Sequence, residues 1–232
     1  MKELVVNADD FGYSEAVNRG VAEAHERGIV TSASLMVRWD ATDTAASYAR
    51  SRPHLGVGLH LDLGEWVYRD GTWVALYERV DLGDPHAVSE ELDSQLETFD
   101  RLVGRPPTHI DSHQHVHLHE PVRQAVLAAA GSLDIPVRRI SPSIAYRGEF
   151  YGQTGRGEPF PQGITPEALA RIIASLTDGV TELACHPGIA WEGSPYGEER
   201  TRETAALSDP RTREAVASAG VLLRSFAGLG FR

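Results

Sequence analysis

Segments with the periodicity of strands and of helices alternate along almost the whole chain. The strand pattern is clearest at 55–63, where the leucines and the valine occupy one parity and Gly56, Gly58, His60 and Asp62 occupy the other. Alternating strands and helices are typical of a parallel sheet covered by helices. With about seven strand candidates, we predict an α/β fold. We expect a complete or incomplete (β/α) TIM-like barrel, rather than an open sheet, formed by one domain over residues 1–232.

The hydrophobic periods and turn residues also place the individual elements. The predicted strands are 4–8, 29–37, 55–63, the start of a histidine-rich run at 109–119, 135–140, 180–185 and 221–226. The predicted helices are 14–28, 41–50, 88–103, 121–130, 165–176, 200–207 and 211–219. Two segments rich in glycine, 64–87 and 141–164, are predicted to be long loops, and loops of that length are often functional.

The histidine-rich run holds five of the chain's ten histidines within eleven residues. Alternate side chains of a strand share a face, so Asp111 and His113 are expected on one side. A strand that ends in imidazoles indicates a metal site at its carboxyl end. The alternatives are a solvated histidine-rich loop, or a run that binds metal incidentally as an affinity tag does. Both are less favoured because the run is internal and interrupted by apolar residues.

Carboxylates and imidazoles lie at the carboxyl ends of four predicted strands. They are Asp9 and Asp10 after the first strand, His60 in the third, Asp111 and His113 in the histidine run, and His186 after 180–185. Barrel enzymes build their active sites at this end of the strands. We therefore predict that these side chains meet in one site.

Such a set matches metal-assisted hydrolysis. Two imidazoles and one carboxylate on a divalent metal leave positions for water and substrate. The metal lowers the pKa of its bound water toward ~7 and polarises a carbonyl group. A second carboxylate can then act as general base, and a further histidine can protonate the departing amine.

Each of these residues also fits a role outside catalysis. Asp9 and Asp10 fit a turn into a helix, and His60 fits a hydrogen-bonded core histidine. His186, which precedes Pro187, fits a plain turn at a strand end.

Asp111 and the remaining histidines of the run are expected close to the metal site. His109 and Asp111 fit a direct role and a packing role equally well. His115 and His117 are predicted to contact the substrate or to support the ligands, because one metal needs few imidazoles. Trp66, Tyr68 and Trp73 are candidates for stacking on a sugar ring, although aromatic residues in a loop more often only pack it against the protein.

Charge and composition limit the classes of binding partner that we expect for this protein. A net charge of −11 argues against nucleic acid or an anionic membrane as the main partner. Cys185 is the single cysteine, so no internal disulfide forms. The first residues run directly into a strand without the apolar region of a signal peptide, so we expect a cytoplasmic protein. The sequence leaves open whether the chain forms a homodimer.

Four motifs together resemble those of the YdjC-like carbohydrate deacetylases, which include the chitooligosaccharide deacetylases. They are Asn7-Ala8-Asp9-Asp10-Phe11-Gly12, Gly58-Leu59-His60, Thr108-His109-Ile110-Asp111-Ser112-His113-Gln114-His115-Val116-His117 and Cys185-His186-Pro187. The resemblance runs in order from residue 4 to about 210. It implies a distorted (β/α) barrel related to the polysaccharide deacetylases.

The resemblance also implies roles for individual residues. A divalent metal would be bound by Asp10, His60 and His113, with Asp9 as general base and His186 as the acid or a substrate contact. Most family members carry His-His-His where this chain has His113-Gln114-His115, so position 114 is not essential to the predicted site. The mixed nitrogen and oxygen ligands favour zinc, whereas the family is often described with magnesium, so the metal's identity stays open.

The predicted function is therefore a metal-dependent hydrolase. It removes N-acetyl groups from amino sugars or short N-acetylated oligosaccharides such as diacetylchitobiose, with a metal-bound water as nucleophile and Asp9 as general base. The alternatives are hydrolysis of another amide or ester by the same site, and a metal-binding or sugar-binding protein without catalysis.

Overall fold

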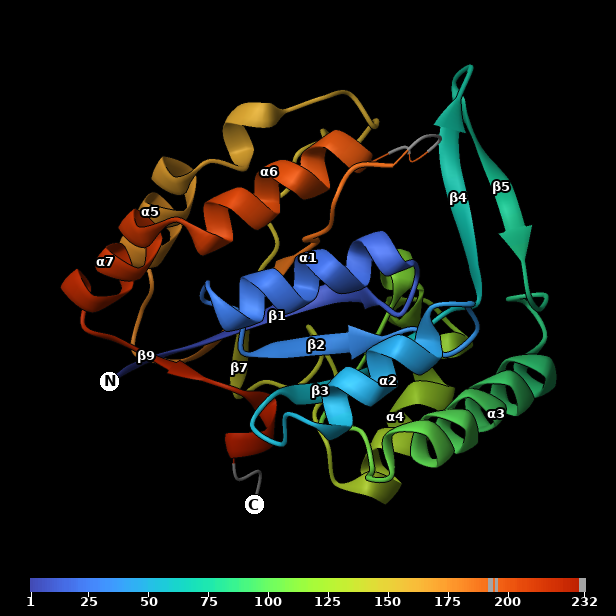
Figure 1. Ribbon diagram of the computed structural model, residues 1–232. Helices are drawn as coiled ribbons and strands as arrows, with labels where there is room; N and C mark the ends of the chain where they lie inside the picture. The colour runs from blue at the N-terminus through green and yellow to red at the C-terminus, as the bar shows by residue number, and fades with distance from the viewer. Residues whose placement is uncertain (192–193, 195, 230–232) are drawn as a thin grey trace.

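The structure is a computed structural model that describes residues 1–191, 194 and 196–229. A parallel sheet of seven strands forms its centre, in the order β6-β3-β2-β1-β8-β7, and β9 also pairs with β1 (Figure 1). The strands are β1 (Lys2–Phe11), β2 (Ser32–Leu35), β3 (Gly56–Leu61), β6 (Ile110–Ser112), β7 (Ile144–Arg147), β8 (Gly179–Cys185) and β9 (Val221–Arg224).

The sheet is curled into a half-barrel, which confirms the predicted fold class. β8 pairs with β1 along Lys2–Ala8 on one side. On the other side β9 pairs with the first half of β1 and β2 with its second half. Because two strands share one edge of β1, the sheet bends around this central strand.

Seven helices accompany the sheet in the described part of the chain (Figure 1). They are α1 (Glu15–Glu26), α2 (Thr42–Arg50), α3 (Pro85–Val103), α4 (Val122–Leu133), α5 (Pro166–Ala174), α6 (Gly197–Ser208) and α7 (Pro210–Ser218). The side chains of Ser14, Asp84, Thr165 and Asp209 cap four of them by accepting hydrogen bonds from the first turn. None of the described helices is long and apolar enough to cross a membrane.

The two faces of the sheet differ in chemistry. Leu4, Val6 and Ala8 of β1 belong to the apolar core, while Asn7 and Asp9 are buried on the opposite face. The other central strands repeat this alternation, so the helix-covered face is apolar and the inner face is small or polar. In β3, Leu59 and Leu61 therefore face the helices, whereas Gly58 and His60 face the inside of the half-barrel.

Three predicted elements are wrong. The segment 64–87 is not a loop: it forms an antiparallel hairpin of β4 (Gly64–Arg69) and β5 (Thr72–Glu78), and α3 begins within it at Pro85. The hairpin turns at Asp70-Gly71, where both residues have positive φ, as a tight type I′ turn requires. Most of its side chains are exposed, so the burial alternation that identifies a strand was weak.

The other two errors concern neighbouring segments. The predicted strand 135–140 is a turn in which only Val137 bridges to Ile110. Pro136 has no amide proton to donate to a sheet, and Arg139 adopts a positive φ. The predicted loop 141–164 contains β7, an edge strand on β8 whose residues are only partly buried.

Candidate metal centre

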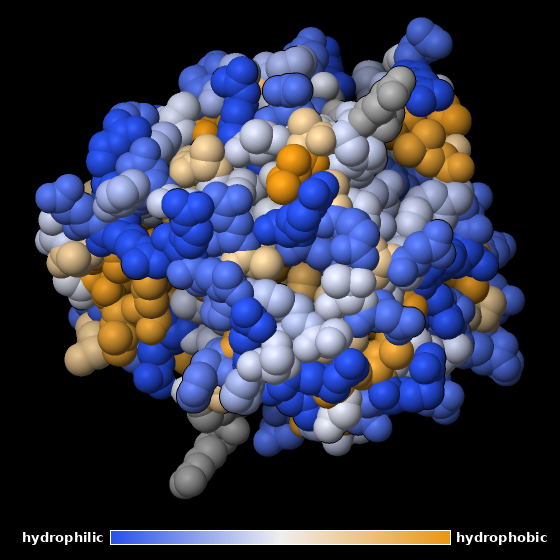
Figure 2. Space-filling model, in the orientation of Figure 1, coloured by the Kyte–Doolittle hydropathy of each residue, from blue (hydrophilic) through white to orange (hydrophobic). Residues whose placement is uncertain are grey.

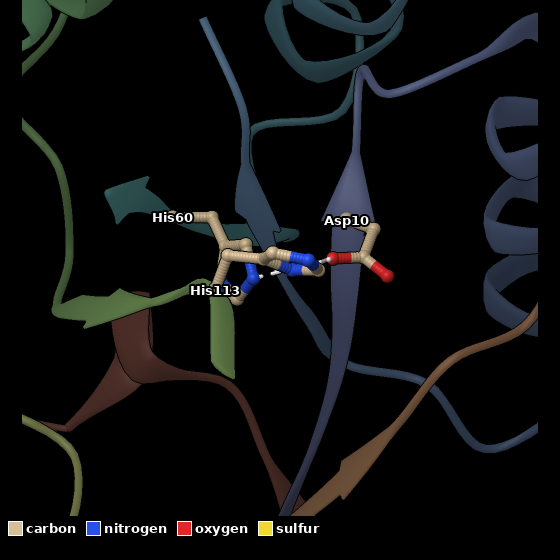
Figure 3. A group of neighbouring side chains, drawn as sticks. All are labelled: Asp10, His60 and His113. Carbon is tan, nitrogen blue, oxygen red and sulfur yellow. Dashed lines mark hydrogen bonds and ion pairs between the residues drawn. The ribbon is translucent and has the colours of Figure 1, made fainter. Parts of the chain in front are cut away.

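Asp10, His60 and His113 meet at the carboxyl ends of β1, β3 and β6 (Figure 3). Asp10 Oδ1 lies 3.3 Å from His60 Nε2 and 3.1 Å from His113 Nδ1. One possible ligand atom from each of the three residues lies within 4.8 Å of the others. The structure thus brings together the three residues that the resemblance implied as ligands.

A local irregularity in β1 directs both aspartates toward this site. Successive side chains of a regular strand point to opposite faces, which would separate Asp9 from Asp10. The pairing of β1 with β2 shifts register between Ala8 and Phe11, and Asp10 has a φ of 62°. Bulges of this kind redirect a side chain next to a functional site.

His60 is held in one orientation by Asp111. Asp111 Oδ1 lies 2.8 Å from His60 Nδ1, which leaves Nε2 facing Asp10. Burial alone would lower the pKa of His60, but the carboxylates of Asp111 and Asp10 raise that pKa to about 10. A histidine oriented by a carboxylate is common in metal sites, and the negative field that raises this pKa also favours a cation.

Arg200 of α6 binds the other oxygen of Asp10. Its Nη2 lies 2.6 Å from Asp10 Oδ2, so Oδ1 is left to face the two imidazoles. Burial opposes ionisation of Asp10, yet Arg200 and His113 hold its pKa well below the ordinary range. Asp10 is therefore a carboxylate at neutral pH.

Arg138 is an important residue that the sequence reasoning missed. Its fully buried guanidinium forms ion pairs with three carboxylates, at 2.6 Å to Asp9, 2.7 Å to Asp111 and 2.7 Å to Glu182. It lies in the segment that was wrongly predicted to be a strand. The sequence signal was only an arginine pair, Arg138-Arg139, inside a short apolar stretch.

A second group, Asp9, His60 and Asp111, also has ligand atoms within 4.8 Å of one another. All four oxygens of its two carboxylates already accept hydrogen bonds or form ion pairs, with Asn7, Ser34, His60 and Arg138. In the other group Arg200 binds only Oδ2 of Asp10, so Oδ1 faces the two imidazoles alone and is left for a cation.

Asp9 and His186 lie next to each other beside Asp10, His60 and His113, which are called the ligand group below. His186 Nε2 is 3.7 Å from Asp9 Oδ2, and Asp9 Oδ1 accepts a hydrogen bond from Asn7. Burial lowers the pKa of His186 to about 4, so this imidazole is neutral at pH 7. The two residues predicted to be catalytic are thus neighbours, although the sequence separates them widely.

Glu203 of α6 lies on the side of His186 away from Asp9. Its Oε1 is 3.9 Å from His186 Nδ1 and accepts a hydrogen bond from the Tyr196 hydroxyl at 2.6 Å. Burial raises the pKa of Glu203 to about 8, even though the Tyr196 hydroxyl and the His186 amide donate to it. Glu203 therefore carries a proton at neutral pH.

The other histidines of the run occupy different surroundings. His109 stacks on Phe226 with ring centroids 4.0 Å apart and pairs with Ser34. His117 contacts Ser112 and the carbonyl of Arg138. His115 lines the cleft described below, so of these three it is the one placed to meet a substrate.

Acid should destabilise the protein through His109 and His117. Both are almost fully buried, and burial lowers the pKa of each from 6.5 to about 4. As the pH falls below 6.5, these two imidazoles bind protons in the unfolded chain but stay neutral in the folded chain until the pH approaches 4. Stability is therefore complete above pH 6.5 and falls as the pH approaches 4, by up to ~3 kcal/mol for each histidine.

Urea unfolding at several pH values between 7 and 4, in the presence of a metal chelator, measures this loss in the free energy of unfolding. The variant His117→Gln should show a shallower pH dependence, whereas His54→Gln, at an exposed position, should match the parent chain. Equal slopes for all three proteins would contradict the assignment.

The ligand group opens into a cleft of about 900 Å³. This volume is at the upper end of the roughly 300–1,000 Å³ of typical ligand sites. Aromatic residues from several elements line it: Tyr13, Trp66, Tyr68, Trp73, Tyr146, Tyr151, Trp191 and Tyr196. The cleft can therefore hold a ligand much larger than a metal ion.

The loop that carries His186 is packed directly against α1. A Cβ atom on Gly20 would lie 2.2 Å from the Cα of Gly188, and the amide of Ile189 donates to the carbonyl of Ala16. Gly20→Ala should therefore displace the loop, lower the free energy of unfolding by ~1–3 kcal/mol and reduce turnover. Urea unfolding and kcat measure the two effects. Gly131→Ala, which meets open space in α4, is the control and should cost neither stability nor activity.

Residues 3–218 match the model of the YdjC-like proteins. The chain belongs to the YdjC-like family. Of its YdjC-like relatives, a carbohydrate deacetylase of Geobacillus stearothermophilus is 35% identical, over 96% of each chain. A chitooligosaccharide deacetylase of Serratia marcescens is 33% identical, over 98% of this chain and 99% of the relative. The resemblance drawn from the four motifs is thus confirmed.

Solved structures share the half-barrel fold of this chain. A protein from Enterococcus faecalis V583, with a suggested role in cellobiose-phosphate cleavage, superimposes with a TM-score of 0.76 at 28% identity over 97% of each chain. A family 4 carbohydrate esterase from Streptomyces lividans, in complex with acetate, gives a TM-score of 0.58 at 10% identity, over 96% of this chain and 91% of the esterase. The latter likeness establishes the shared fold alone.

Proposed function

We propose that this YdjC-like protein is a divalent-metal-dependent hydrolase that removes N-acetyl groups from amino sugars or short N-acetylated oligosaccharides. The observation that carries the proposal is the ligand group of Asp10, His60 and His113, with Asp9 and His186 beside it at the base of one cleft. The names of the Geobacillus and Serratia relatives support the acetylated sugar as substrate.

The residues present fit a metal ion. Two imidazole nitrogens converge on one carboxylate oxygen, and His113 Nε2 has no hydrogen-bond partner among the described residues. Asp10, His60 and His113 would hold the ion, and zinc and magnesium are the candidates. When bound, it would lower the pKa of a water molecule toward ~7 and polarise the amide carbonyl.

Asp9 would accept the proton of the attacking water. Burial opposes its ionisation, but Arg138 outweighs burial and lowers its pKa, so the carboxylate is charged and ready to accept. Arg138 contacts both oxygens of Asp9 and thereby fixes their direction. This contact makes Arg138 a positioning residue.

His186 would protonate the departing nitrogen. It is neutral at pH 7 and Glu203 is protonated, so the pair holds the proton that the amine needs. Transfer from Glu203 Oε1 to His186 Nδ1, with release from Nε2, delivers that proton to the amine. The present 3.9 Å separation agrees with the long catalytic hydrogen bonds of ligand-free enzymes, which tighten in the substrate complex.

A panel of acetylated substrates tests the proposed reaction. Purified protein, supplied with zinc or magnesium, is incubated with N,N′-diacetylchitobiose, N-acetylglucosamine, an O-acetylated sugar and a non-sugar acetamide, and acetate is measured. Acetate from the N-acetyl sugars is the expected result. Acetate from the ester or the non-sugar amide alone would indicate a different hydrolase, and sugar binding without acetate would indicate a binding protein.

A further inference from the structure

The hairpin β4–β5, residues 64–78, projects from the body of the protein (Figure 1) and is called the arm below. It carries large exposed apolar side chains: Tyr68, Trp73, Val74 and Leu76. Figure 2 shows hydrophobic atoms gathered over the arm. Trp73 is 58% exposed. Large apolar groups gathered on a soluble protein mark a binding surface more often than a structural one.

The base of the arm is fixed to the sheet by a buried carboxylate. Asp62, which is fully buried, accepts hydrogen bonds from Trp39 Nε1 at 3.0 Å, the Tyr77 hydroxyl at 2.8 Å and Arg79 Nε at 2.8 Å. An isolated two-stranded hairpin is marginally stable in water. Tyr77 belongs to the arm, Arg79 follows it directly, and the ring of Trp39 packs on that of Tyr77. These contacts give the base of the arm its tertiary support.

A second contact joins the arm to the metal centre. The side chain of Gln114 accepts a hydrogen bond from the Trp66 amide at 2.9 Å and donates one to the Trp66 carbonyl at 2.8 Å. It thus pairs with β4 as a neighbouring strand would. Gln114 directly follows His113, and Glu65 of β4 lies 3.9 Å from His113 Nε2. The arm is therefore a fixed wall of the site.

The arm and the ligand group line the same cleft. Its walls include Asp10 and His113 at the base, Tyr68 and Trp73 on the arm, and the loop 154–157. Tyr68 and Trp73 pair across the two strands, with ring centroids 5.6 Å apart. Tyr68 lies three strand residues beyond Glu65, which is roughly 10 Å farther along the arm. A single sugar ring positioned for reaction at the ligand group does not extend to these aromatic rings.

We propose that the arm is a binding platform for a second part of the substrate. Trp73, with Tyr68 beside it, stacks on a pyranose ring of an N-acetylated oligosaccharide whose reacting unit lies at the metal centre. The C–H face of a pyranose is apolar, and burying it on an indole ring is favourable, while the hydroxyls at its rim stay in water. The arm thereby makes the protein select chains of at least three sugars over the monosaccharide. This inference rests on the proposed function for its choice of substrate.

The test compares Trp73→Ala with the parent protein on N,N′,N″-triacetylchitotriose and on N-acetylglucosamine. We expect the variant to lose about tenfold in kcat/KM for the trisaccharide, mainly through KM, and nothing for the monosaccharide. Trp73→Phe should recover most of the loss. Leu76→Ala is the matched control, because Leu76 is an exposed apolar residue of the same strand that does not line the cleft.

Calorimetric binding of the trisaccharide gives a readout that does not require turnover. Trisaccharide binding that weakens in Trp73→Ala, without acetate release by any protein, would uphold the arm and overturn the proposed reaction. Acetate release that Trp73→Ala leaves unchanged, or that falls equally on both sugars, would overturn the arm alone. Neither binding nor acetate would overturn both. If Trp73→Ala changes only the molecular mass in solution, measured by light scattering, and neither sugar binding nor turnover, the arm is a contact between copies of the chain and the proposal is wrong.

Discussion

Asp9→Asn should lower the turnover number for acetate release from N,N′-diacetylchitobiose by ~10²–10⁴-fold. Asparagine has the shape of aspartate but cannot take a proton from the attacking water. The ligand group does not include Asp9, so the variant should still bind its metal. Turnover and the metal content of the dialysed protein are the two measurements.

The neighbouring residue supplies the matched comparison. Asp10→Asn removes the ligand oxygen that both imidazoles face, so this variant should lose metal affinity and turnover together. If Asp9→Asn kept more than a tenth of the parent turnover, Asp9 would not be the base. If it lost its metal as Asp10→Asn does, the choice between the two overlapping ligand groups would be wrong.

Arg138→Met should reduce the free energy of unfolding by ~3–5 kcal/mol. The substitution leaves the carboxylates of Asp9, Asp111 and Glu182 buried together without their shared cation. Removing one partner of a buried ionic cluster costs far more than the cluster contributes as a whole, because the remaining charges have lost their solvent and their counter-charge. Urea unfolding of the metal-free protein, read at constant m-value, measures the loss.

Two further variants keep this prediction testable. Arg211→Met removes an exposed arginine that also pairs with two carboxylates, on Glu167 and Asp209, and it should change stability little because solvent screens those pairs. If Arg138→Met does not fold, Arg138→Met combined with Glu182→Gln should restore part of the stability, since it carries one buried carboxyl fewer. Equal stabilities of Arg138→Met and Arg211→Met would contradict the account.

The convergence of Asp10, His60 and His113 could be predicted because the signal for it is local. Asp10, His60 and His113 each follow or end a short apolar strand, and the carboxyl ends of parallel strands meet at one edge of a sheet. In each case the end of the apolar strand and the candidate ligand lie within a few residues of each other in the sequence. The topology then brings together residues that are far apart in the chain.

Arg138 could not be predicted in the same way. Its partners Asp9 and Glu182 are 129 and 44 residues away, and nothing next to Arg138 distinguishes it from a surface arginine. A buried cation is identified only when the carboxylates around it are placed in space. The turn at 135–140 that carries it has the composition of a strand, because its apolar residues pack on the sheet edge, although only Val137 pairs with that edge.

The arm was missed because its sequence does not have the local pattern of a half-buried strand. Its strands are exposed on both faces, so 64–78 lacks the burial alternation on which strand prediction depends. The Asp70-Gly71 pair was a usable signal, because this dipeptide favours the tight hairpin turn that the structure contains. The aromatic residues noted there as candidates for sugar stacking do line the cleft.

A metal titration tests the central claim most directly. The protein is stripped with chelator, zinc or magnesium is added in steps, and acetate release from N,N′-diacetylchitobiose is followed. We predict no turnover without metal, a rise to a plateau with the supporting metal at one ion per chain, and no recovery in His113→Ala at the same metal concentrations. Full turnover by the stripped protein, or turnover in His113→Ala equal to that of the parent, would contradict the account.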